Sequence, residues 1–125
     1  MKNLIYKNDT YYISDDISDS KGKSRILKYK ATREEMPHKH FSKYIVVYGR
    51  HTCPYCIKTV ELLKKYPKVL FVEIDVEPNQ LFGKQNLLEI LKPEIGGHST
   101  VPIVFDKGAF VGGASDAENR FLQIK

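Results

Sequence analysis

The sequence predicts an α/β protein in which a four-stranded mixed sheet carries flanking helices. Two observations support this prediction. From residue 43 to the end, runs of β-branched and aromatic residues alternate with helical patterns in the order β-α-β-α-β-β-α. The first three of these elements make a right-handed βαβ unit, and the last two strands are close enough for a hairpin. A chain of 125 residues is long enough for one such domain with a small appendage.

The first strand and the first helix follow each other directly. Residues 43–48 (KYIVVY) form a β-branched and aromatic run that is bounded by Gly49, which predicts a strand. Residues 56–63 then place apolar side chains at helical spacing, and Pro67 ends the pattern. Both cysteines of the chain lie at the junction between these two elements.

The position of the cysteines suggests their chemistry. Pro54 suits the first helical position, because its missing N–H costs nothing there, so Cys53 takes the N-cap position. The free N–H groups of the first turn and the helix dipole favour a thiolate and hold the pKa of Cys53 below the usual range. Cys56 lies one turn further along the same side, close enough for a disulfide. We expect Cys53 to attack and Cys56 to resolve.

The second strand and the second helix complete the first half of the domain. Residues 69–76 (VLFVEIDV) predict a strand, because apolar and acidic residues alternate near its end. Residues 78–92 predict a helix with leucines on one face. Pro93 and the following glycines should end this helix.

A hairpin and a last helix complete the second half. Residues 101–105 (VPIVF) predict a strand that begins near a proline, and residues 109–111 should pair back across a short loop. Ser115 or Asp116 is a natural N-cap for the last helix. Its inward face would carry Ala117, Phe121 and Ile124.

Residues 1–40 do not share this regular pattern. Residues 11–13 and 25–29 are short β-prone runs on either side of the polar residues 14–24, which favours a β-hairpin. Because an isolated hairpin is marginal in water, we expect it to pack on the main domain or to stay mobile. We therefore divide the chain into an N-terminal extension of unknown role and a main domain, residues 41–125.

The composition and the charge indicate where the protein acts and what it binds. The net charge is +5, but acids are scattered among the lysines, which favours a solvated surface over a face that binds nucleic acid. No apolar stretch is long enough to span a membrane, and the first residues lack the apolar core of a signal peptide. Two cysteines in a reducing compartment are more typical of redox or metal chemistry than of a scaffold. We expect a cytoplasmic monomer that binds neither nucleic acid nor membrane.

Three separated motifs resemble the glutaredoxins of the thioredoxin superfamily. Residues 53–56 (CPYC) are the dithiol glutaredoxin sequence, and basic Arg50 precedes it by three residues, as in the family. Residues 100–102 (TVP) match the family's Thr-Val-Pro, whose proline is cis and lies beside the cysteines. Residues 112–116 (GGASD) match the turn that leads into the last helix. The resemblance covers the main domain and implies a thioredoxin-like fold with glutathione-dependent thiol–disulfide oxidoreductase activity.

The resemblance also implies a glutathione site. The backbone edge at Val101, beside a cis Pro102, would pair with the cysteinyl unit of glutathione. Arg50 would bind the glycine carboxylate, and the N–H groups at Ser115 and Asp116 would bind the γ-glutamyl carboxylate. The Asp116 carboxylate would pair with the γ-glutamyl ammonium, and Tyr55 would cover one side. The expected set consists of catalytic Cys53 and Cys56 and of glutathione-binding Arg50, Tyr55, Thr100, Val101, Pro102, Gly113, Ser115 and Asp116.

Two positions depart from the family pattern. The family usually has a Gln or Arg in the second helix that holds the glycine carboxylate, whereas counting back from Thr100 places Glu89 there. Because an acid would repel the ligand, no residue is assigned to that role. His51 stands where a proline or a small residue is frequent in the family. We favour an imidazole that faces solvent over one that alters the reactivity of the Cys53 thiol.

Two metal-binding alternatives stay open. His38, His40, Cys53 and Cys56 could form a Cys₂His₂ zinc set, although their spacing fits no standard finger. In the wider family an iron–sulfur cluster is held by the first cysteine and glutathione across a dimer, typically in variants without this Pro-Tyr pair. We expect no metal. The predicted activity is the reduction of protein disulfides and protein–glutathione mixed disulfides, with glutathione as co-substrate.

Overall fold

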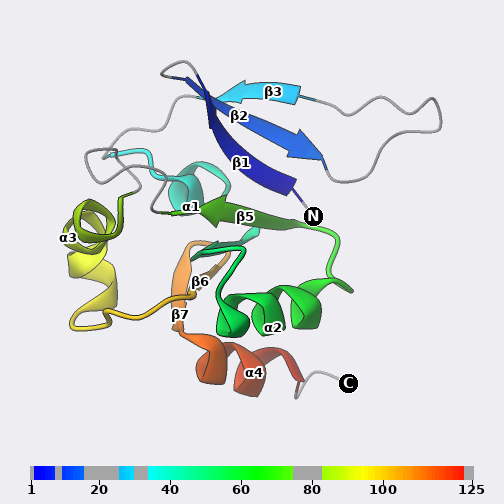
Figure 1. Cartoon of the computed structure of the whole chain (residues 1–125). Helices are drawn as coiled ribbons and strands as arrows, with labels where there is room; N and C mark the ends of the chain where they lie inside the picture. Colours follow the sequence, from blue (N-terminus) through cyan, green and yellow to red (C-terminus); the bar gives the residue numbers. More distant parts are fainter. Residues whose placement is uncertain (1, 8–9, 16–25, 30–33, 75–82, 123–125) are drawn as a thin grey trace.

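The computed structural model describes residues 2–7, 10–15, 26–29, 34–74 and 83–122 (Figure 1). In this part of the chain, one sheet holds seven strands in the order β3-β2-β1-β5-β4-β6-β7. The strands are β1 (Lys2–Lys7), β2 (Thr10–Asp15), β3 (Ile26–Tyr29), β4 (Ile45–Gly49), β5 (Val69–Glu73), β6 (Ile103–Asp106) and β7 (Ala109–Gly112). The helices are α1 (Pro37–His40), α2 (Pro54–Leu63), α3 (Lys84–Ile95) and α4 (Ala114–Leu122).

The predicted four-stranded mixed sheet is confirmed as strands β5, β4, β6 and β7. Strands β4 and β5 are parallel and are joined through α2, as a βαβ unit requires. Strand β6 lies antiparallel to β4 on its other side, and β7 pairs back on β6 across the short hairpin. The α/β class and the predicted element order of the main domain are both correct.

The N-terminal strands extend this sheet at the edge of β5. Strands β2 and β3 are antiparallel, which confirms the predicted hairpin. Strand β1 was not predicted, because the only apolar run before residue 10 is three residues long. It pairs antiparallel with β2 and parallel with β5, with Lys2 opposite Leu70. Because the sheet continues across residue 40, the division into an extension and a main domain stays a prediction.

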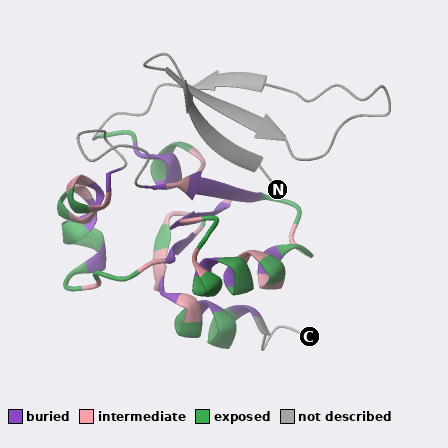
Figure 2. Ribbon diagram, in the orientation of Figure 1, coloured by how far each residue is buried: buried purple, intermediate pink, exposed green. Residues whose placement is uncertain are grey.

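Two hydrophobic cores lie on the two faces of the sheet. Alternate residues of β4 face opposite sides, so Ile45 and Val47 join one cluster while Val46 and Tyr48 join the other. The first cluster packs α2 and α4 against the sheet, and these two helices lie side by side (Figure 1). The second cluster packs α3 against the other face. Figure 2 shows that the buried residues follow the sheet and the inner sides of the helices.

Helix α3 ends three residues later than the predicted Lys92, although one of the predicted glycines does end it. Helix α3 continues through Pro93 to Ile95, and Gly96, at φ 60°, ends it. The N–H of Gly96 donates to the Lys92 carbonyl at 2.9 Å, so the last turn closes without an N–H from Pro93. Residues 78–82 of the predicted helix lie outside the described residues.

No helix in the described ranges is long and apolar enough to cross a membrane.

The start of α4 also differs from the prediction. Neither Ser115 nor Asp116 is the N-cap, because the helix already includes Ala114. The Gly113 carbonyl instead accepts the first intrahelical bond, from the Ala117 N–H at 3.0 Å. Asp116 is in the first turn, and its carboxylate accepts the N–H of Gly113 at 3.2 Å, which is the return half of a capping box. Ala117 and Phe121 are buried, as predicted, while Ile124 lies outside the described residues.

Candidate active site

The start of helix α2 places Cys53 where a thiolate is favoured. Cys53 is the N-cap, with extended backbone angles, and Pro54 occupies the first turn, as predicted. The Cys53 sulfur makes no capping hydrogen bond. The nearby backbone N–H of Cys56 nevertheless lowers the pKa of Cys53. The N–H of Tyr55 and the charge of Arg50 act in the same direction, and burial acts against them. Cys53 is half-buried, so a disulfide can reach it.

Cys56 has the opposite character. Its side chain is buried, and its sulfur accepts the backbone N–H of Arg50 at 3.4 Å. Burial raises the pKa of Cys56 to about 11, and the neighbouring Cys53 and the charge of Glu73 add to this effect. Both cysteines are free thiols in the structure. The structure therefore places one thiol that ionises readily beside one that does not, which supports their predicted roles.

Gly49 allows the strand to approach the buried thiol. A Cβ at this position would lie 2.7 Å from Cys56 Sγ and 3.3 Å from its Cβ. The first distance is too short for non-bonded atoms and the second is tight, so a larger residue would require Cys56 or the backbone beside it to shift. The last residue of β4 is thus a glycine because of packing against the active-site helix.

The segment between β4 and α2 is held by Glu73, the last residue of β5. The Glu73 carboxylate accepts the backbone N–H of His51 at 3.0 Å and lies 2.5 Å from its imidazole Nδ1. The His51 side chain is 77% exposed, which agrees with the predicted solvent-facing imidazole, but it is bound to an acid. Sequence reasoning missed Glu73, because its only signal was an acidic residue at the end of a strand that pairs with the cysteine-bearing unit.

The second motif lies at the start of β6. The Val101–Pro102 peptide bond is cis, as the resemblance implies. Thr100 is exposed, Val101 is half-buried and Pro102 is buried. The carbonyl of Pro102 lies 3.6 Å from where a Cβ of Gly113 would stand, so the second and third motifs are in contact.

The third motif is shaped by its two glycines. Gly112 has φ 136°, and a Cβ there would collide with the carboxylate of Asp116. At Gly113 a Cβ would lie 3.2 Å from the His98 ring. Ser115 and Asp116 are exposed on the first turn of α4, so their N–H groups belong to the free donors of a helix start.

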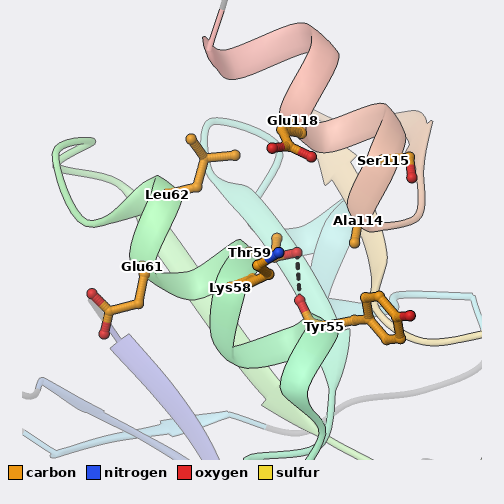
Figure 3. Close-up of a pocket in the computed structure, with 8 residues that line it drawn as sticks. All are labelled: Tyr55, Lys58, Thr59, Glu61, Leu62, Ala114, Ser115 and Glu118. Atoms are coloured by element: carbon orange, nitrogen blue, oxygen red, sulfur yellow. Dashed lines mark hydrogen bonds between the residues drawn. The ribbon is translucent and has the colours of Figure 1, made fainter.

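A groove runs between α2 and α4 from Tyr55. Its volume is about 360 Å³, and both helices supply its walls (Figure 3). The ring of Tyr55, which is 64% exposed, points towards Ala114 and Ser115, and the Thr59 hydroxyl donates to the Tyr55 carbonyl at 2.9 Å. Two residues of the predicted set, Tyr55 and Ser115, therefore lie on facing walls. The lining residues are Tyr55, Lys58, Thr59, Glu61, Leu62, Ala114, Ser115 and Glu118.

The histidines of the zinc alternative have other partners. His38 is completely buried; its Nδ1 lies 2.8 Å from the Tyr48 hydroxyl and its Nε2 lies 2.9 Å from the Glu94 carboxylate. Its ring stacks on Phe105 at 3.9 Å. His40 Nδ1 lies 2.7 Å from Glu35. Both ring nitrogens of His38 are thus engaged, and no metal-binding cluster occurs among the residues described.

Comparison with known proteins identifies relatives for most of the main domain. The family model described as Glutaredoxin matches residues 45–111. Glutaredoxin 1 of Rickettsia prowazekii (strain Madrid E) is 37% identical over 75 residues, which are 60% of this chain and 74% of that protein. Glutaredoxin-C2 of Arabidopsis thaliana is 35% identical over 79 residues, 62% of this chain and 67% of that protein. The holo form of glutaredoxin C1 from Populus tremula x tremuloides superposes with a TM-score of 0.54 at 27% identity, covering 66% of this chain and 78% of that one.

Proposed function

The chain belongs to the glutaredoxin family, whose members are thiol–disulfide oxidoreductases, and we propose that it uses glutathione to reduce protein disulfides and protein–glutathione mixed disulfides. The contrast between its two thiols is the observation that carries this proposal. The lowered pKa of Cys53 favours the thiolate that would act as the nucleophile, and the raised pKa of Cys56 keeps the second thiol protonated until it is needed.

The proposed reaction of a mixed disulfide has two steps. The Cys53 thiolate attacks the glutathione sulfur, so a bond forms between Cys53 and glutathione while the bond to the protein sulfur breaks. The protein thiolate leaves and takes a proton. A second glutathione thiolate then attacks the glutathione sulfur on Cys53. This step releases glutathione disulfide and returns the Cys53 thiolate.

A protein disulfide follows the dithiol route. Cys53 attacks one sulfur of the substrate and forms a mixed disulfide with it. Cys56 then loses its proton and attacks Cys53, which releases the substrate as a dithiol and leaves a Cys53–Cys56 disulfide. Two glutathione molecules reduce this disulfide and form one glutathione disulfide. The position of Cys56 one helical turn from Cys53 supports this internal step.

The proposed glutathione site is assembled from the three motifs. Arg50 directly follows β4, Val101 lies just before β6, the strand that pairs with β4, and Gly113 joins the cis Pro102 to α4. The N–H groups at Ser115 and Asp116 supply a helix start for the γ-glutamyl carboxylate. The proposed binding residues are Arg50, Tyr55, Thr100, Val101, Pro102, Gly113, Ser115 and Asp116.

We place the protein in the reducing cytoplasm as a monomer, with glutathione and disulfide-bearing proteins as partners and without a metal, nucleic acid or membrane. The catalytic domain spans residues 41–125, in agreement with a family match that begins at residue 45. Residues 1–40 add strands to its sheet.

A coupled assay on a glutathionylated peptide tests the proposal. Cys53→Ser should abolish turnover, whereas Cys56→Ser should keep much of it, because the second glutathione replaces the resolving thiol. With a disulfide-bonded protein as substrate, both variants should be inactive. Turnover of either substrate by Cys53→Ser would contradict the assignment of the nucleophile.

The use of glutathione is tested by changing the reductant. Glutathione and N-acetylcysteine are compared as reductants at equal thiolate concentration. N-acetylcysteine lacks the γ-glutamyl and glycine carboxylates that the site would bind. We expect glutathione to regenerate the enzyme at least about tenfold faster, which equals about 1.4 kcal/mol of added transition-state binding. Equal rates with the two reductants would contradict the proposed glutathione site but not the oxidoreductase activity.

A further inference from the structure

His98 lies in the segment that leads from α3 to β6 (Figure 1). The same segment carries Thr100–Pro102, the second of the three motifs. The backbone N–H of His98 donates to the Ile95 carbonyl at 3.2 Å, so this residue is tied to the end of α3. Its side chain is half-buried. His98 therefore has a fixed place two residues before the motif that contains the cis-proline.

The ring of His98 contacts β7 and the turn that follows this strand. It packs edge-on against Phe110, with the ring centroids 5.5 Å apart. Phe110 in turn packs against Phe105, which is fully buried, with centroids 5.7 Å apart. A Cβ at Gly113 would lie only 3.2 Å from Cε1 of His98, so the ring also lies against the Gly113 backbone. The ring thus connects an aromatic pair of the core to the third motif.

The Nε2 atom of His98 indicates that the ring acts through its shape. This nitrogen is buried, and none of the described residues forms a hydrogen bond with it. A buried polar atom without a partner costs free energy, so Nε2 does not stabilise the position of the ring. The packing of the ring atoms supplies the contact instead. A ring of similar shape without the nitrogen should therefore serve as well.

Gly113 links His98 to two parts of the proposed glutathione site. A Cβ at Gly113 would lie 3.6 Å from the Pro102 carbonyl oxygen, beside the edge that would pair with the cysteinyl unit. The Gly113 N–H donates to the Asp116 carboxylate at 3.2 Å, within the helix start that would bind the γ-glutamyl carboxylate. A shift of Gly113 would therefore change the separation of the two parts. Glutathione would span both of them, whereas N-acetylcysteine has no γ-glutamyl group.

We propose that His98 is a positioning residue that holds Gly113 against Pro102 and so makes the site select glutathione over thiols without a γ-glutamyl group. This inference rests on the proposed glutathione site. Without the ring, the turn at Gly113 would lose its support, and the γ-glutamyl carboxylate would be held less well in the transition state. The lowered pKa of Cys53 arises from α2 and Arg50, so the nucleophile itself should be unchanged.

Two mixed disulfides of one peptide test this role. In the first the peptide sulfur is bonded to glutathione, and in the second it is bonded to N-acetylcysteine. The Cys53 thiolate of the reduced protein attacks the disulfide, and the peptide leaves as a thiolate that takes a proton. Mass spectrometry gives the second-order rate constant of this release. In the wild-type protein the constant should be at least about tenfold larger for the glutathionylated peptide.

The variants are compared by the ratio of these two rate constants. His98→Ala should lower the ratio at least about threefold, while the constant for the N-acetylcysteine disulfide stays within about twofold of wild type. His98→Phe restores a ring, so its ratio should stay within about twofold of wild type. His40→Ala is the matched control, because its imidazole is 40% exposed and pairs with Glu35, outside the three motifs. It should leave the ratio within about 1.5-fold.

Three results would overturn the role of His98. These are an unchanged ratio in His98→Ala, an equal loss of both rate constants in that variant, and a ratio in His98→Phe as low as in His98→Ala. The second result would show a general effect on folding in place of an effect on selection. Wild-type protein that reacts equally fast with both peptides would contradict the proposed glutathione site, and this inference with it.

Discussion

Single residues explain why two identical thiols differ so much. Cys53 lies half-buried at a helix start, where N–H groups and Arg50 favour the thiolate. Cys56 lies one turn further, closed in by the backbone of β4 at Gly49. Position therefore lowers the pKa of one thiol and raises that of the other, which supports the proposed roles of nucleophile and resolving thiol.

The pH dependence of alkylation measures this difference. Because the pKa of Cys53 lies below the usual range, its thiolate persists as the pH falls below that range and is lost only below its own pKa. Cys56, with a pKa of about 11, stays a thiol up to strongly alkaline pH. Iodoacetamide at neutral pH should therefore label Cys53 first, as read by mass spectrometry between about pH 5 and pH 10. Equal labelling of the two cysteines would contradict the assignment.

Glycines allow the strands and helices around the site to approach each other closely. The closest approach is between β4 and α2, where Gly49 meets Cys56. Helix α4 depends on a comparable approach, because Gly112 and Gly113 leave room for Asp116 and for the His98 ring. These glycines explain why the end of β4 and the third motif cannot carry a larger side chain at these positions.

Gly49→Ala tests the packing of β4 against α2. The added methyl group would overlap Cys56 Sγ, so the free energy of unfolding should fall by about 1–3 kcal/mol. Gly97→Ala is the control: no atom lies within 4 Å of its added Cβ, and its effect should stay within about 0.5 kcal/mol. Urea unfolding of the reduced proteins gives both values. Similar stabilities would mean that the strand and the helix are not in close contact.

At the level of the whole molecule, the N-terminal strands change the edge of the sheet. Without them β5 would be an edge strand with unpaired backbone groups, and such edges favour association. Strand β1 covers that edge along Leu70–Val72, one residue before Glu73. The extension therefore borders the strand that carries the acid beside the active site.

Asn3→Pro tests this arrangement. Because β1 lies between β2 and β5, a proline at this position removes a ladder hydrogen bond on one side or the other. The free energy of unfolding should fall by at least about 1 kcal/mol, and hydrogen exchange at Leu70–Val72 should accelerate. Asn3→Ala keeps the N–H and is the control. If the β5 amides exchange at the same rate in both variants, β1 does not pair with β5 in solution.

Much of the domain is encoded locally. The alternating apolar runs predicted β4, β5, β6 and β7, the spacing of the cysteines predicted the start of α2, and three short motifs predicted a cis Pro102 near the site. These features depend on neighbouring residues, so a linear pattern records them. The errors concern helix ends, where Pro93 is tolerated in a last turn and Gly113 replaces the expected N-cap.

Only the tertiary structure revealed the long-range partners. The pairing of β1 with β5, the contact of Glu73 with His51 and the burial of His38 between Tyr48 and Glu94 join residues far apart in the chain. No periodicity or spacing encodes such contacts, because they arise when elements that each form for local reasons pack together. The sequence by itself thus determined the family and the main strands and helices, and it predicts which thiols react. Packing decided which charges surround those thiols and which strand borders them.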